Sequence, residues 1–164
     1  MMKNDEDLLA LLRELDDPKW PEWPQSYDRS ETAVRFNALV ARLAGDFAAR
    51  CTADPDNQDS SEYGRVTVPA EATACGTRIV VCVSKFGSLA LVCADNPGAF
   101  LGTQDAQAEG ELDATDLAKA NRALIDLGYV VVPEELLESD YAGPSHLPER
   151  GRRPTWWDRF FGIF

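Results

Sequence analysis

The stretch that most constrains the fold runs from residue 65 to residue 96, and it carries the densest β-forming pattern in the chain. Residues 66–68 alternate apolar and polar side chains, which is typical of a strand with one buried face. Residues 79–83 (IVVCV) and 89–94 (LALVCA) are apolar or small at every position. A continuous apolar run of this length indicates a strand that is covered on both faces.

The segment 84–88 (SKFGS) joins the two longest runs. It is either a hairpin turn or a bulge that bends one long strand, and we favour the hairpin. Residues 128–133 (GYVVVP) supply a further short strand. The flanking segments have helical periodicity, so the sequence predicts an α+β fold. We expect a small, mostly antiparallel sheet of about four strands, packed by helices and with N- and C-terminal helices.

Helical periodicity is clearest before and after this stretch. Leucines on one face predict a helix over 5–15. Apolar residues at three- and four-residue steps predict the main helix, with Ser30 as its N-cap and an end at about residue 50. Asp113 is placed to cap a helix that ends before Gly128, and 103–113 is acidic and weakly ordered in pattern. At 164 residues, the chain is predicted to be a single domain, 1–164.

Residues 1–29 form a helical and Pro/Trp-rich arm. Its first helix either packs on the domain or docks on a partner, and we favour packing. Trp20 and Trp23 lie among prolines that forbid a continuing helix. Two large aromatic side chains in an irregular segment either pin it to the core or form an exposed binding hot spot.

Residues 141–164 read as a Pro/Gly-rich linker and a terminal aromatic helix. Thr155 and Asp158 have the spacing of a capping box. The segment 155–164 (TWWDRFFGIF) is too short to cross a membrane but could lie on one. Because it carries few cations, we expect it to dock on the protein's own core.

The connector 51–64 (CTADPDNQDSSEYG) is polar and carries Asp54, Asp56, Asp59 and Glu62. It lacks the central glycine and the terminal glutamate of a calcium-binding EF-hand loop, so we predict no metal site there. It is expected to be a solvated loop, and its alternative role is an acidic patch for a basic partner. These four acids, with Trp20 and Trp23, are the candidate partner-binding residues.

Composition narrows the function classes. A net charge of −12 argues against nucleic-acid binding, which relies on Lys and Arg. The longest apolar runs fall far short of the roughly 20 residues of a membrane span. The N-terminus is acidic where a signal peptide would be basic, so we expect a cytoplasmic protein whose four cysteines are free thiols.

Motifs for catalysis are missing from the sequence. It has no phosphate-binding glycine loop, no nucleophile elbow and no H-E-x-x-H, no two cysteines form a C-x-x-C pair, and His146 is the single histidine. We therefore predict no catalytic residues, no metal ligands and no cofactor, and we interpret the protein as a non-enzyme.

The order of YGRVTVPAEAT, GTRIVVCVSKFGSLALV, LGYVVVPEELLESDYAG and TWWDRFF resembles that of small cytosolic actinobacterial proteins, the immunity proteins of polymorphic toxin systems. The resemblance covers roughly residues 27–164 and implies a protein that binds and neutralises a cognate toxin. It supplies no binding residues.

The leading hypothesis is therefore a non-catalytic protein-binding protein, an immunity protein whose partner is a basic toxin domain. Acidic loops would speed the encounter with such a partner by electrostatic steering. The alternative is a small enzyme or ligand-binding domain with a pocket between the sheet and the helices. A structural or accessory role is the third class.

Overall fold

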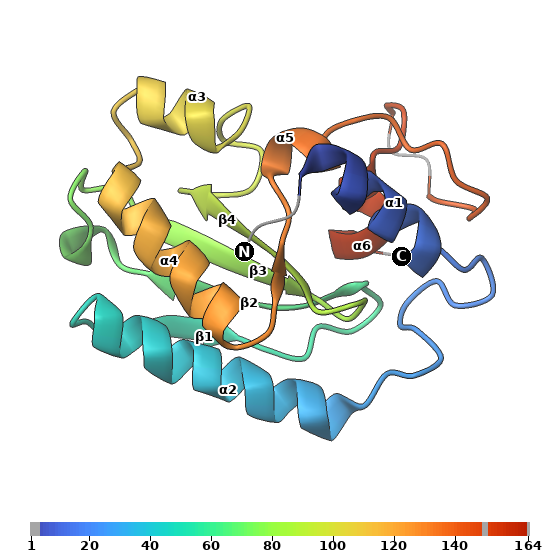
Figure 1. Ribbon diagram of the computed structural model, residues 1–164, viewed down its shortest axis with the longest axis horizontal. Helices are drawn as coiled ribbons and strands as arrows, with labels where there is room; N and C mark the ends of the chain where they lie inside the picture. The colour runs from blue at the N-terminus through green and yellow to red at the C-terminus, as the bar shows by residue number, and fades with distance from the viewer. Residues whose placement is uncertain (1–3, 149–150, 164) are drawn as a thin grey trace.

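The computed structural model describes residues 4–148 and 151–163. Its centre is one five-stranded sheet in the order β1-β2-β3-β4-β5 (Figure 1). Every neighbouring pair is antiparallel except β4 and β5, which are parallel. The α+β prediction with a mostly antiparallel sheet is therefore confirmed. The strands are β1 (Thr52–Asp54), β2 (Glu62–Val68), β3 (Ile79–Ser84), β4 (Leu89–Ala94) and β5 (Val130–Val131).

Six α-helices and one 3₁₀ turn accompany the sheet in the described part of the chain. The main helix is capped by Asp28, whose carboxylate accepts the Glu31 N–H at 3.0 Å. The N-cap is therefore Asp28 and not the predicted Ser30, and the helix ends at residue 46 instead of about 50. The helical elements are α1 (Asp5–Leu15), α2 (Arg29–Asp46), η1 (Ala70–Ala72), α3 (Thr103–Ala108), α4 (Ala114–Asp126), α5 (Glu134–Leu137) and α6 (Trp156–Phe161).

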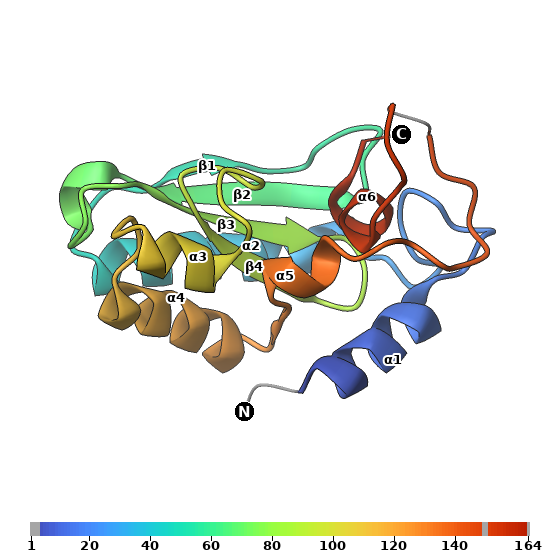
Figure 2. The ribbon, with the colours of Figure 1, turned by 90° about the horizontal axis from the view of Figure 1, so that it is seen from above.

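Both faces of the sheet are covered, because successive side chains of a strand point to opposite faces. In β3, Val81 and Val83 join a core with α2, α3 and α4. Val80 and Cys82 join a second core with α1, α5 and α6. In Figure 2, α2 and α4 lie along one side of the sheet, and α6 sits beside the start of β2. The unbroken apolar pattern of β3 and β4 is the sequence signature of this double coverage.

Of three local predictions, one agrees with the structure and two differ from it. The hairpin between β3 and β4 is confirmed. The 51–64 connector was expected to be a loop throughout, but β1 pairs with β2 at its start. All three β1 side chains are exposed, so this edge strand has no apolar alternation that would predict it. The segment 103–113 contains α3, where a weakly ordered stretch was expected.

The terminal helix α6 has the expected capping box, with the Thr155 hydroxyl and the Asp158 carboxylate bonded to each other's backbone N–H. Trp156, Phe160 and Phe161 are buried in the second core. Ile163 is 62% exposed, and Phe164 lies outside the described residues. No helix in the described ranges is long and apolar enough to cross a membrane.

Candidate functional site

The N-terminal arm is held in place by a buried arginine of α6. Arg159 is fully buried, and its Nε donates to Asp16 Oδ1 at 2.6 Å. Its two Nη groups donate to backbone carbonyls of the arm, those of Asp17, Trp20 and Pro21, at 3.0–3.2 Å. The segment between α1 and α2 has only isolated turn bonds of its own, such as Trp20 N–H to the Asp17 carbonyl. Arg159 supplies donors to three of its backbone carbonyls. We call this arrangement the Arg159 clamp.

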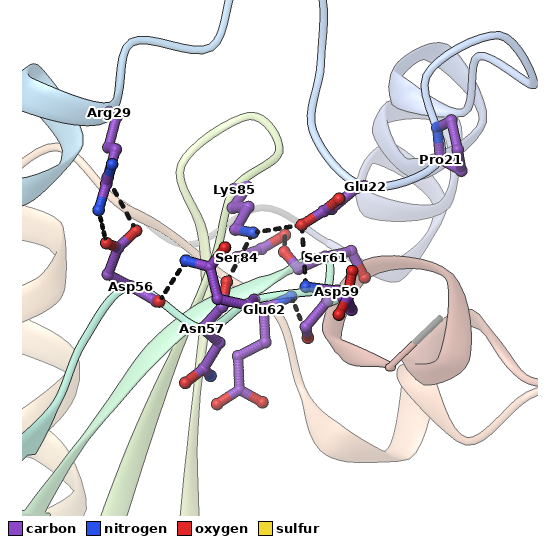
Figure 3. A network of polar contacts seen from close by, with 12 residues as sticks. Pro21, Glu22, Arg29, Asp56, Asn57, Asp59, Ser61, Glu62, Ser84 and Lys85 are labelled. Atoms are coloured by element: carbon purple, nitrogen blue, oxygen red, sulfur yellow. Dashed lines mark hydrogen bonds and ion pairs between the residues drawn. The ribbon is translucent and has the colours of Figure 1, made fainter.

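A second network joins the arm to the acidic connector (Figure 3). Lys85, in the β3–β4 turn, has a side chain only 4% exposed, and its Nζ donates to the Asn57 carbonyl at 2.8 Å. The same Nζ lies 3.4 Å from Glu22 Oε1, which also accepts the Asp59 backbone N–H at 3.0 Å. The arm, the connector and the hairpin turn therefore form one continuous surface.

Trp23 is the large aromatic side chain that this surface presents to solvent. It is 42% exposed, its ring stacks on Tyr27 at a centroid distance of 6.3 Å, and Lys85 Nζ lies 5.7 Å from its ring centroid. Trp23, Tyr27, Lys85 and Asp56 line one cavity of about 260 Å³. Trp23 is therefore in contact with Tyr27 and Lys85, while part of its ring stays accessible.

Trp20, the other predicted aromatic anchor, has a different place. It is half-buried, and its carbonyl is one of the acceptors in the Arg159 clamp. The sequence allowed each tryptophan either to pin the arm or to be exposed as a binding residue. Trp20 helps to fix the arm, and Trp23 is exposed.

The four predicted acidic residues do not form one patch. Asp54 and Asp59 are exposed, and no ion pair among the described residues includes either of them. Asp56 is paired with Arg29 at the start of α2 (Figure 3), with Arg29 Nε at 3.1 Å from its Oδ1. Its charge is therefore partly neutralised within the molecule.

Glu62 corrects the prediction of a solvent-facing charge. It is 2% exposed and belongs to β2, where it accepts two bonds from Arg65 at 2.6 and 3.0 Å. Burial raises the pKa of Glu62, and the Arg65 guanidinium opposes that rise. The prediction was wrong because β2 begins inside the polar connector, so the residue lies in the sheet and not in a loop.

The described residues contain no group of three or more His, Cys, Asp and Glu side chains arranged to hold a metal ion. His146 is exposed, in the segment after α5.

The residues that build this surface were mostly missed from the sequence. Arg159 is the one basic residue within the aromatic terminal helix, and that isolation is a signal that could have marked it. Lys85 lies in a tight turn directly after a buried strand. Nothing local marks Glu22, because its partners are 37 and 63 residues away.

Comparisons with known proteins give no relative: no family model, no curated protein and no solved structure matches this chain.

Proposed function

We propose that this protein is a non-catalytic protein-binding protein of the cytosol, an immunity-type protein that neutralises a basic toxin domain. The observation that carries the proposal is Trp23, an exposed aromatic side chain on an arm that the Arg159 clamp and the Lys85 network hold in place. Exposed aromatic anchors with rigid support are the residues that dominate binding energy at interfaces. A pre-ordered arm also loses little conformational freedom when it binds.

The charge distribution supports a basic partner. The net charge is −12, and the exposed carboxylates of Asp54 and Asp59 lie on the connector that adjoins the arm. Solvent-exposed charges act mainly on the association rate, and salt screens them beyond about 8–10 Å. Trp23 should therefore set how long the complex lasts, and the acids should set how fast it forms.

The test begins by capturing binding proteins from the cytosol of the source cells with the immobilised protein. The captured partner is then purified for stopped-flow measurements. Trp23→Ala should raise the dissociation rate about tenfold or more. Leu101→Ala, which truncates an 80% exposed leucine beside α3, is the matched control and should change little.

A second pair of variants tests steering. Asp54→Asn with Asp59→Asn should slow association a few-fold at low salt and much less at high salt. Glu6→Gln with Glu109→Gln is the matched control, because it removes the same charge from exposed positions on α1 and after α3. The proposed binding surface is contradicted if Trp23→Ala and Leu101→Ala have the same dissociation rate and the association rate does not depend on salt.

A further inference from the structure

A polar cavity of about 200 Å³ lies between the start of α2 and the β3–β4 hairpin. The arm contributes Tyr27 to its wall, α2 contributes Arg35, the hairpin contributes Ser88, and Tyr129 closes it from the segment before β5. The volume is below the roughly 300–1,000 Å³ of sites for drug-sized ligands, so it suits a group of few heavy atoms. It is a different cavity from the one beside Trp23, although Tyr27 and Lys85 border both.

Arg35 is a cation without a carboxylate partner. Its Nη1 donates to Ser88 Oγ at 2.5 Å, and its guanidinium carbon lies 5.6 Å from the centroid of the Tyr129 ring. None of the ion pairs among the described residues includes it, although Glu31 is one helical turn away. A guanidinium has five N–H donors. Arg35 therefore keeps donors for a further acceptor.

Two tyrosines in the wall of the same cavity also have hydroxyl groups for which the described residues supply no hydrogen-bond partner. Tyr129 is 6% exposed, and the hydroxyls of Tyr27 and Tyr129 are both buried with no hydrogen-bond partner among the described groups. Buried polar groups in folded proteins are nearly always paired. Burial raises the pKa of each tyrosine to about 12, so both remain protonated donors at neutral pH.

We propose that this cavity binds a small oxyanion, the carboxylate or phosphate group of a small molecule, through Arg35, Tyr27 and Tyr129. The three side chains supply one positive charge and several donors, which is the complement of an acceptor-only group. Lys85 also lines the cavity, but its Nζ donates to the Asn57 carbonyl. Asp28 and Glu31 line it too and would repel additional negative charge. The site therefore favours a single compact oxyanion over a polyphosphate. The inference does not depend on the proposed protein partner.

The test is a titration of the ¹⁵N-labelled protein with sodium phosphate and, separately, with sodium acetate, each at constant ionic strength set by sodium chloride. Saturable amide shifts should gather at residues 27–35, 84–88 and 129. Saturation by one salt alone identifies which oxyanion the site prefers and supports the proposal. Shifts that do not saturate with either salt, or that spread over the whole surface, overturn it.

The variants separate this site from general charge effects. Arg35→Gln should weaken binding about tenfold or more, because a hydrogen bond to a charged group is lost. Arg42→Gln, on the same helix but paired with Asp46 and Asp126, removes the same charge and should leave binding unchanged. Equal weakening by both variants overturns the proposal.

Tyr129→Phe keeps the ring that packs on Arg35 and removes only the hydroxyl. It should weaken binding several-fold while the dispersion of the spectrum and the melting temperature stay close to those of the unaltered protein. This variant keeps the test decisive if Arg35→Gln does not fold. Unchanged binding by Tyr129→Phe contradicts the role of the hydroxyl.

Discussion

Glu134 is a carboxylate held inside the protein, at the first turn of α5. It is 3% exposed, and its Oε2 has no hydrogen-bond partner among the described groups. Burial raises its pKa from 4.5 to about 7, against hydrogen bonds from the Cys93 thiol and the Gly98 backbone that lower it, and nearby Glu138 and Glu135 raise it further. The folded protein therefore holds a proton that the unfolded chain releases at lower pH.

This shift predicts that Glu134 makes the protein less stable as pH rises. Below pH 4.5 the residue is protonated in both states and has no such effect. Between pH 4.5 and about 7 the unfolded state ionises first, so the free energy of unfolding falls. The full loss, about 3 kcal/mol, is reached above pH 7. Glu134→Gln should therefore gain stability relative to the unaltered protein between pH 5 and pH 8.

Denaturant unfolding at pH 5 and pH 8 measures this difference. Glu109→Gln removes an exposed carboxylate and serves as the control, since its effect should be small at both pH values. Parallel pH profiles for Glu134→Gln and the unaltered protein would show that Glu134 ionises normally in the fold.

At the scale of elements, the Arg159 clamp joins α6 to the arm that follows α1. Arg159 lies 4.6 Å from the centroid of the Phe86 ring and 5.1 Å from that of Phe160, so its charge is enclosed by aromatic rings as well as by acceptors. Asp16 also accepts bonds from Tyr141 and Ser145, each at 2.5 Å. The clamp thus gathers the arm, α6 and the 141–145 segment around one buried ion pair.

Breaking this pair should be strongly destabilising. Arg159→Met leaves the Asp16 carboxylate buried without its cation and leaves the Trp20 and Pro21 carbonyls without a donor, which should cost about 3–5 kcal/mol. Arg153→Met, at a guanidinium that is 86% exposed, should cost less than about 1 kcal/mol. Urea unfolding of the two variants and of the unaltered protein measures both losses.

The double variant Arg159→Met with Asp16→Asn distinguishes the ion pair from the packing of the side chain. It should be more stable than Arg159→Met alone, because it no longer leaves a bare buried charge. If the second substitution only adds to the loss, the cost of Arg159→Met comes from the carbonyls and the aromatic packing.

At the scale of the whole molecule, the cysteines report on cooperativity. All four are free thiols, in agreement with the sequence analysis. Cys75 is exposed, whereas Cys82 and Cys93 lie in the two central strands. The contact with Cys82 and burial raise the pKa of the Cys93 thiol well above its ordinary value, so little of the reactive thiolate forms.

In the absence of reductant, the exposed and buried thiols should therefore differ strongly in their rates of alkylation. Cys75 should react within minutes in the folded protein, while Cys82 and Cys93 should react only at the rate at which the sheet unfolds globally. All four should be modified after denaturation. Mass spectrometry over time measures both phases, and Cys75→Ser should remove the fast one. Rapid modification of Cys82 in the folded state would contradict a cooperative two-sided core.

The sequence by itself determined the features that depend on residues close together in the chain, namely strands, helices and their caps. The hydrophobic runs of β3 and β4 imposed strands covered on both faces, and the leucine periodicity of α1 matched the helix to the residue. The Asp113 and Thr155 caps were readable because a cap and its N–H lie within three residues of each other.

Only the tertiary structure decided the candidate site. Whether Trp20 or Trp23 faces solvent depends on Arg159, which lies 139 residues from Trp20 along the chain. The burial of Glu62 depends on where β2 begins. Arg35 of α2 donates a hydrogen bond to Ser88, which lies 53 residues further along the chain. No local periodicity in the sequence predicts such contacts. They form because the two packed cores bring distant polar groups together, and a buried polar group without a partner costs free energy.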